Sequence, residues 1–273
     1  MTEAFPSHGN EVVLLETPKR GISLAIQQIL YADAYTERIA KRICEDRDVP
    51  MKFCKLDSPV FYEWKSLFMK QLGIERRIER KLPANTLLLG GNRWRHHYAL
   101  FLSDMPIVVL DAHSDMSYDE MVFFRLVRPY NWIYFKLRQG TEVHLITQKF
   151  NSLKRTDVVV PKENFKKFHL YSFDKENSLA KISLHVLGSE VIEVKDPEES
   201  CELLVEKNKE ISLDWDITRI ISQERVEKLL GKISRDGDVC DIWLDEGEKS
   251  KRKTLEEQTQ CCARIFEILD NER

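Results

Sequence analysis

The chain has 273 residues, and 42 basic against 45 acidic side chains leave a formal net charge of −3. This balance argues against general nucleic-acid binding, which favours a strongly basic domain. No apolar run approaches the ~20 residues needed to span a bilayer, so we expect no membrane segment. The length fits one α/β domain with a sizeable core, and we predict a single domain over residues 1–273.

The cysteines and the N-terminal residues indicate the compartment. None of the six cysteines forms a C-x-x-C pair, so we interpret them as reduced thiols rather than as a disulfide framework or a zinc knuckle. The first ten residues, M-T-E-A-F-P-S-H-G-N, lack the basic segment and apolar core of a secretory signal. We therefore expect a cytoplasmic protein.

Apolar runs and helical periodicity predict the elements along the chain. Strands are expected at residues 11–16, 87–89, 107–110, 211–213 and 239–244. Helices are expected from residue 23 to about 44, from Ser58, from 222 to 233 with Ser222 as N-cap, and from 254 to 269. Several of the short apolar runs in the middle third should be edge strands or hairpins, which leaves few helices there. These runs are residues 132–135, 143–146, 158–160, 169–171, 182–186 and 191–194.

Three histidines, His144, His169 and His185, lie inside apolar runs of this middle third. A single histidine in such a run is more often a hydrogen-bonded core residue than a proton shuttle. We expect the same of these three.

The segment Pro106 to Asp115, P-I-V-V-L-D-A-H-S-D, changes from apolar to acidic within one residue. Asp111, His113 and Asp115 alternate, so they can face one side if the backbone stays extended. Ligands of open α/β sheets bind at the carboxyl ends of strands, and ionised carboxylates held out of water without a partner are very costly. A divalent cation explains this set best. In the alternative, Asp111 caps a helix and His113 makes ordinary hydrogen bonds.

Two further strand ends repeat this pattern. The run I-S-L-D-W-D-I places Asp214 and Asp216 at alternate positions after a strand. Upstream, three leucines lead into Gly90-Gly91, and His96 and His97 follow. Oxygen ligands supplemented by imidazole suit Mn²⁺ better than an ion that prefers thiolates. Four carboxylates can balance the charge of two divalent cations.

The motifs G-G-x-x-x-x-H-H, D-A-H-S-D and S-L-D-W-D resemble, in order and approximate spacing, those of the arginase/agmatinase (ureohydrolase) superfamily. The resemblance is strongest to the compact branch with the peptide arginases of bacterial ribosomal-peptide pathways, which convert arginine side chains to ornithine. It implies an α/β fold of three layers, α/β/α, with a mostly parallel central sheet (arginase/deacetylase-like). The chain departs from the pattern where Arg93-Trp94-Arg95 precede the histidines and where Thr218-Arg219-Ile220 replace Asp-Pro.

The resemblance also implies a site with two Mn²⁺ ions. The ligands of one ion would be His97, Asp111, Asp115 and Asp214. The ligands of the other would be His113, Asp111, Asp214 and Asp216. We prefer His97 to His96 because H-Y-A-L after it is similar to a helix start of the family, and His96 would then orient the ligands. Asp115 would also pass a proton to the leaving nitrogen.

A fourth strand end carries Asp245 and Glu246, and in ureohydrolases a glutamate at the corresponding end grips the guanidinium group. Either residue is a candidate for this role here, and the alternative is a polar loop before the basic run K-S-K-R-K. Residues 116–119, M-S-Y-D, lack the Asn and Ser with which arginases hold the head group of free arginine. This absence fits an arginine embedded in a peptide.

The resemblance therefore implies Mn²⁺-dependent hydrolysis of arginine side chains in a peptide, for example a ribosomal precursor peptide, to ornithine and urea. Three alternatives stay open: a ureohydrolase of free arginine or agmatine, a single-zinc amide hydrolase of the deacetylase type, and a non-catalytic peptide-binding homologue. The sequence does not fix the oligomeric state, and a homo-oligomer is compatible with it.

Overall fold

The computed structural model describes residues 11–16, 38–43, 45–46, 51–55, 86–90, 105–116, 131–147, 159–173, 179–184, 188–205, 208–235, 238–243 and 255–271. Within these residues, eleven strands form one sheet in the order β2-β1-β3-β11-β10-β4-β5-β7-β9-β8-β6. Neighbouring strands are parallel, except that β8 and β9 are antiparallel. The predicted α/β class with a mostly parallel sheet is thus confirmed, whereas the single domain over residues 1–273 stays a prediction.

The strands have the following bounds: β1 Glu11–Glu16, β2 Met51–Lys55, β3 Thr86–Gly90, β4 Ile107–Leu110, β5 Val143–Ile146, β6 Val159–Val160, β7 Phe168–Tyr171, β8 Leu179–Leu184, β9 Ser189–Lys195, β10 Glu210–Asp214 and β11 Val239–Trp243. The helices are α5 Trp132–Arg138, α6 Cys201–Val205, α7 Gln223–Ile233 and α8 Leu255–Asn271, with 3₁₀ turns η1 Lys162–Lys167 and η2 Trp215–Arg219. Each strand expected from the sequence is present within one to three residues, apart from the run 132–135.

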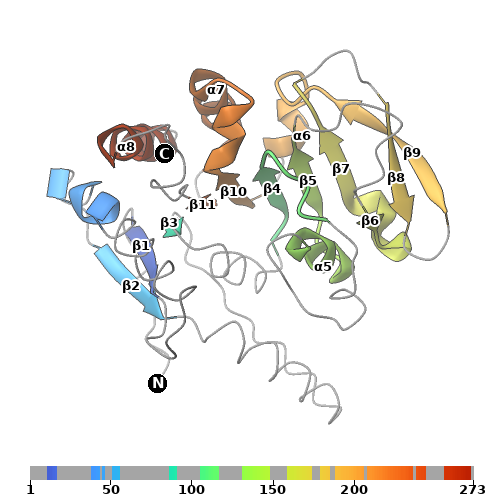
Figure 1. Ribbon diagram of the computed structural model, residues 1–273, viewed down its shortest axis with the longest axis horizontal. Helices are drawn as coiled ribbons and strands as arrows, with labels where there is room; N and C mark the ends of the chain where they lie inside the picture. The colour runs from blue at the N-terminus through green and yellow to red at the C-terminus, as the bar shows by residue number, and fades with distance from the viewer. Residues whose placement is uncertain are drawn as a thin grey trace, which may run out of the picture.

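Helices cover both faces of the sheet, and the alternation of side chains along β4 divides the core between them. Val108 and Leu110 pack in one apolar cluster with residues of α6, α7 and α8. Ile107 and Val109 pack in a second cluster with residues of α5. Figure 1 shows α7 and α8 on one side of the sheet and α5 on the other. All four β4 side chains are buried, as expected for a continuous apolar run in a parallel sheet.

The run 132–135 is helical, and so its assignment to the strand-like runs was wrong. It forms the start of α5, in which residues 132–137 are all buried. A run of four apolar residues fits either a strand or part of a buried helix. A helix that is hydrophobic on all sides is buried on all sides. Gly140, with φ +88°, ends the helix, and its N–H donates to the carbonyl of Leu137 at 2.9 Å.

The predicted C-terminal helices are confirmed. Ser222 caps α7, and its hydroxyl accepts a hydrogen bond from the N–H of Arg225 at 3.4 Å. Ile265 and Phe266 of α8 are buried. Residues 38–43 and 45–46 are helical, which agrees with the end of the helix expected from residue 23. The rest of that helix, the helix from Ser58, and His185 lie outside the described residues.

Among the described residues of the middle third, helices are few, as expected. The described residues between β5 and β10 contain α6, the 3₁₀ turn η1, and a strand-rich region with the antiparallel pair β8 and β9. No helix among the residues that the structure describes has the length and apolar character to cross a membrane.

A buried ion pair joins α5 to the start of β10. Lys136 Nζ lies 3.1 Å from Glu210 Oε2, and both side chains are fully buried. Removing one partner of such a pair leaves a buried charge without compensation.

We expect Lys136→Met to lower the free energy of unfolding by about 3–5 kcal/mol, as for a broken buried pair. Urea denaturation followed by circular dichroism measures this change. Arg42→Met is the matched control, because the Arg42–Glu256 ion pair is about half exposed. It should cost only about 0–1 kcal/mol. A cost for Lys136→Met as small as that of the control would contradict the role of the pair.

Candidate metal centre

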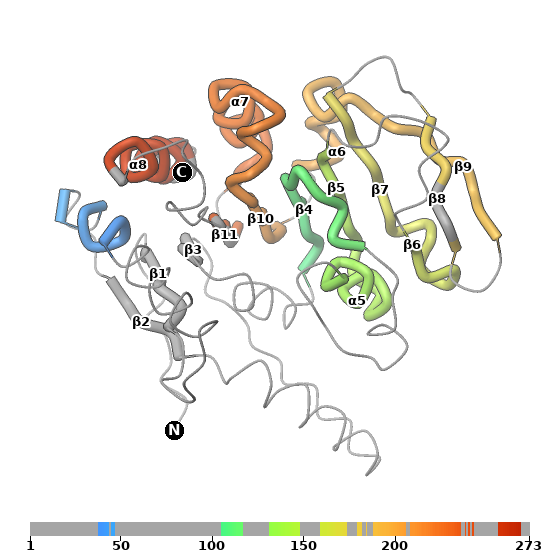
Figure 2. The backbone as a smooth tube through the Cα atoms, viewed as in Figure 1, coloured from blue at the N-terminus to red at the C-terminus, as the bar shows by residue number. Residues whose placement is uncertain are grey.

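The four strands that precede the predicted site residues are neighbours in the sheet. They occur in the order β3-β11-β10-β4 and are parallel. Gly90 lies opposite Trp243, Trp243 opposite Asp214, and Leu213 opposite Leu110. All four carboxyl ends therefore meet at one edge of the sheet, where open α/β sheets bind ligands. Figure 2 shows β11, β10 and β4 side by side.

Some predicted residues of this edge cannot be placed. His96 and His97 after β3, and Asp245 and Glu246 after β11, lie outside the described residues. The structure therefore places the predicted ligands that follow β4 and β10.

Asp111, His113 and Asp216 form a compact cluster across β4 and β10. One ligand atom of each lies within 4.8 Å of the other two. His113 Nδ1 is 2.9 Å from Asp216 Oδ2 and 3.5 Å from Asp111 Oδ1. Both carboxylates are buried, whereas half of the His113 side chain is exposed. The cluster is thus closed on the side of the sheet and open on the side of the imidazole.

Backbone N–H groups hold the carboxylates in place. Asp111 Oδ1 accepts from the N–H of His113 at 2.6 Å, and Asp216 Oδ1 accepts from the N–H of Ala112 at 3.1 Å. Asp214 Oδ1 accepts from the N–H of Asp216 at 3.0 Å and so caps η2. Aspartate side chains commonly accept hydrogen bonds from the backbone two residues later. The alternating Asp residues thus shape both turns.

Asp115 lies where the backbone turns back after β4. Its φ of 45° is in the left-handed region, which aspartate tolerates better than most residues. Its Oδ2 accepts a hydrogen bond from Trp132 Nε1 at 3.1 Å. Burial raises the pKa of Asp115 well above its usual value, and the charges of Asp111 and Asp214 raise it further. Asp115 is therefore close enough to these carboxylates to interact with them electrostatically.

The pKa shifts in the cluster reflect buried carboxylates that lie close together. Burial raises the pKa of Asp111, and the charge of Asp216 adds to the effect. Hydrogen bonds with Asp111 and Asp216 raise the pKa of His113 to about 10 against the opposing effect of burial. For Asp216, burial raises the pKa, but the hydrogen bond and charge of His113 outweigh it, and the net shift is downward. A proton on His113 thus partly compensates carboxylates that a cation could compensate instead.

The donor set fits a hard or borderline divalent ion. Carboxylate oxygens and one imidazole nitrogen converge, which is the type of set that suits Mn²⁺. Asp115 and Asp214 add carboxylates next to it. These residues are consistent with the predicted two-ion site, and its full ligand set stays a prediction.

Trp132 is a residue of this centre that no sequence motif indicates. It is the first residue of α5 and lies in a run that resembled a strand. Only the position of α5 against the end of β4 brings its indole N–H to Asp115. No local pattern in the sequence could have revealed this contact.

Comparisons with known proteins agree with the fold described above. Neither the family models nor the curated proteins gave a match to the chain. Among solved structures, proclavaminate amidino hydrolase from Streptomyces clavuligerus matches with a TM-score of 0.53 at 11% identity, over 98% of this chain and 94% of that one. The agmatine ureohydrolase of Thermoplasma volcanium matches with a TM-score of 0.51 at 12% identity, over 98% and 90%.

A third similar structure is the arginase of Entamoeba histolytica in complex with L-ornithine. Its TM-score is 0.50 at 10% identity, over 94% of this chain and 98% of that one. This chain has the fold of these hydrolases. The likeness extends over almost the whole of each chain, and at such low identity it establishes the fold alone.

We expect Asp216→Asn to weaken binding of a divalent ion at this centre by roughly 100-fold or more, because changes even to groups that only orient metal ligands cost 10–100-fold. The amide keeps the size of the side chain and can still accept from the N–H of Ala112, but it loses the charge. Equilibrium dialysis against Mn²⁺, followed by elemental analysis, measures the affinity. Glu190→Gln on the exposed part of β9 is the control. Equal Mn²⁺ affinity in the two variants would exclude Asp216 as a ligand.

Proposed function

We propose that this protein is a Mn²⁺-dependent hydrolase that cleaves the guanidinium group of arginine side chains in a peptide, giving ornithine and urea. The observation that carries the proposal is the convergence of Asp111, His113 and Asp216 at the carboxyl ends of β4 and β10. The proposal also includes membership of the ureohydrolase superfamily, which the fold and the three motifs support.

Two Mn²⁺ ions, when bound by His97, Asp111, His113, Asp115, Asp214 and Asp216, would supply the positive charge that lowers the pKa of a water molecule towards neutrality. The oxygen of this water forms a bond to the guanidinium carbon, and the bond from that carbon to the side-chain nitrogen breaks. Asp115 passes the proton to the leaving nitrogen. Asp245 or Glu246 pairs with the guanidinium group, because a carboxylate can accept both N–H groups of one fork.

Trp132 keeps Asp115 in position for this role. The indole N–H donates to one carboxylate oxygen of Asp115, and the ring itself is buried. The hydrogen bond fixes the rotation of a carboxylate whose backbone already has an unusual φ.

The choice of a peptide substrate is supported by two features. Residues 116–119, M-S-Y-D, lack the residues expected for binding the head group of a free amino acid. His113 is half exposed, so one side of the cluster is accessible to a side chain that belongs to a larger molecule. The peptide partner, a cytoplasmic location and the absence of nucleic-acid and membrane partners remain parts of the proposal, with a homo-oligomer left open.

A free small guanidine, such as arginine or agmatine, is the second candidate substrate. The names of two similar structures, an agmatine ureohydrolase and an arginase, favour it. A single-zinc amide hydrolase is less well supported, because the charges of Asp111 and Asp214 both act on Asp115. One ion would leave several of these carboxylates without compensation. A non-catalytic peptide-binding homologue would keep the same residues without turnover.

Incubating arginine-containing peptides with the Mn²⁺-loaded protein should release urea and lower the peptide mass by ~42 Da for each arginine converted, as expected when a hydrogen atom replaces the amidine group in two-metal hydrolysis. Mass spectrometry and a urea assay measure both products. Free arginine and agmatine are assayed in parallel. Hydrolysis of free arginine or agmatine but not of the peptides would reverse the choice of substrate. If none of these compounds released urea, the non-catalytic homologue would be the remaining interpretation.

Trp132→Phe should lower kcat by about 10–100-fold, a loss typical of groups that orient metal-site ligands, with KM and Mn²⁺ content unchanged. The phenyl ring keeps most of the buried surface and lacks the donor. Asp115→Asn should reduce turnover further, because it loses the proton carrier itself. A kcat pH profile that shifts in Trp132→Phe would identify an effect on Asp115 rather than on folding.

Ser222→Ala is the control for Trp132→Phe, because it removes the cap of α7 at a cost of about 1 kcal/mol in stability and touches no site residue. Its kcat should equal that of the unmodified protein. If both variants lost the same fraction of activity, Trp132 would have no positioning role.

A further inference from the structure

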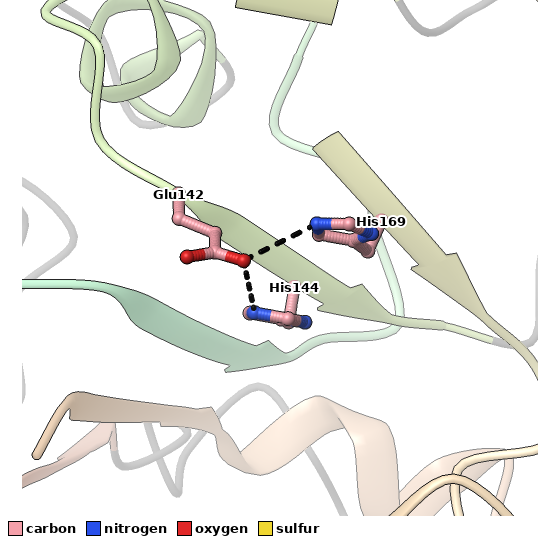
Figure 3. Close-up of side chains that lie close together, drawn as sticks. All are labelled: Glu142, His144 and His169. Carbon is pink, nitrogen blue, oxygen red and sulfur yellow. Dashed lines mark ion pairs between the residues drawn. The ribbon is translucent and has the colours of Figure 1, made fainter. Parts of the chain in front are cut away.

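A second cluster of metal-type ligands lies at the opposite edge of the sheet. Glu142 precedes β5, His144 is the second residue of β5, and His169 is the second residue of β7. The two strands are parallel neighbours, and His144 lies directly opposite His169. The candidate metal centre follows the ends of β4 and β10, whereas this cluster lies at the beginnings of the strands. Figure 3 shows the Glu142 carboxylate facing both imidazole rings.

The distances in this cluster are those of ligands around one ion. Glu142 Oε1 lies 3.4 Å from His169 Nε2 and 3.6 Å from His144 Nε2. Both distances exceed the 2.7–3.2 Å that is usual for an N–H···O hydrogen bond. Two ligands about 2.0–2.1 Å from a tetrahedral Zn²⁺ ion are separated by ~3.3–3.4 Å. One ligand atom from each residue lies within 4.8 Å of the other two.

The two rings already present their Nε2 atoms side by side. They are stacked, with centroids 4.7 Å apart and an angle of 15° between the planes. Both Nε2 atoms lie on the side of Glu142.

Tyr171 orients one of the rings. His144 Nδ1 lies 2.9 Å from the Tyr171 hydroxyl, and His144 is buried. With the proton on Nδ1 and donated to the hydroxyl oxygen, Nε2 carries the lone pair and faces Glu142. Histidine ligands of metals usually hydrogen-bond through their second nitrogen in this way.

The second ring is partly exposed, and its surroundings favour the neutral form of the imidazole. Burial lowers the pKa of His169, and the charge of Lys195 lowers it further against the opposing effect of Glu142. The His169 and Glu142 side chains are 31% and 32% exposed, so an ion can reach them from solvent. Metal binding requires imidazole in its neutral form.

We propose that Glu142, His144 and His169 form a binding site for a divalent transition-metal ion, with Zn²⁺ as the best fit, through one carboxylate oxygen and two Nε2 atoms. Two histidines and one carboxylate, with water in the fourth position, are an established donor set for Zn²⁺. The ion would link β5 to β7 near their amino ends, whereas the proposed hydrolase centre lies at the carboxyl ends of β4 and β10. The site is independent of the proposed function.

Dialysis of the chelator-treated protein against Zn²⁺, followed by elemental analysis, tests the site. We expect Glu142→Gln and His169→Gln to bind one Zn²⁺ fewer than the unmodified protein, whatever the total. Glu190→Gln is the control, because it replaces an exposed carboxylate elsewhere in the same group of strands. Equal Zn²⁺ content in all four proteins would overturn the proposal and leave a cluster of hydrogen-bonded side chains.

A second measurement needs no variant. Zn²⁺ should protect His169 in the unmodified protein from acylation by diethyl pyrocarbonate, as mapped by peptide mass spectrometry. Equal acylation with and without Zn²⁺ would also overturn the site.

Thermal unfolding supplies a third measurement. At a hundredfold excess over its Kd, Zn²⁺ should raise the midpoint of thermal unfolding by roughly 5 °C more in the unmodified protein than in Glu142→Gln.

Failure of this proposal can be distinguished from failure of the proposed hydrolase. Asp216→Asn should still bind the Zn²⁺ ion that Glu142→Gln loses. Glu142→Gln should keep the Mn²⁺-dependent release of urea. If the variants bound as much Zn²⁺ as the unmodified protein, and Zn²⁺ did not protect His169 from acylation, the new site alone would be excluded. If no urea were released, the hydrolase alone would be excluded.

Discussion

Repulsion among carboxylates that are held together at the edge of the sheet is the constraint on which the rest of the structure depends. The register between β4 and β10 places Leu110 opposite Leu213, so the acidic residues that follow each strand lie together. Burial and mutual repulsion raise the pKa of Asp111 and Asp115. Backbone N–H groups and His113 compensate part of this charge, and a cation is the natural complement to the remainder.

Buried ion pairs at the amino ends of β10 and β11 stabilise the sheet and offset the repulsion at the carboxyl ends. Lys209, just before β10, and Asp238, just before β11, form a buried ion pair at 2.8 Å. Asp238 also accepts from the backbone N–H of Lys209 at 3.0 Å, which ties the two strand starts together. Lys136 anchors the start of β10 to α5. Functional sites often depart from the most stable local choice, and the surrounding structure compensates.

Much of the fold and part of the site could be predicted because their signals are local. The change from Leu110 to Asp111, and from Leu213 to Asp214, marks a strand end in the sequence itself. A turn held by the Asp111 side chain, and not a continued extended strand, then brings Asp111 and His113 together. The helical state of residues 132–138 could not be inferred in the same way, since it depends on burial on every side. The contact of Trp132 with Asp115 was hidden for the same reason.

The same distinction explains why the sequence alone does not reveal the cluster of Glu142, His144 and His169. Along the chain, His144 and His169 are separate histidines in separate apolar runs, and each alone resembles a core residue. They meet because β5 and β7 are neighbours in a register that pairs them, and neither strand order nor register is encoded in either run. Ligand sets within one strand can therefore be recognised in a sequence by their alternation. A set whose histidines stand singly in separate apolar runs becomes visible only when the sheet is assembled, and Glu142, two residues before His144, then completes it.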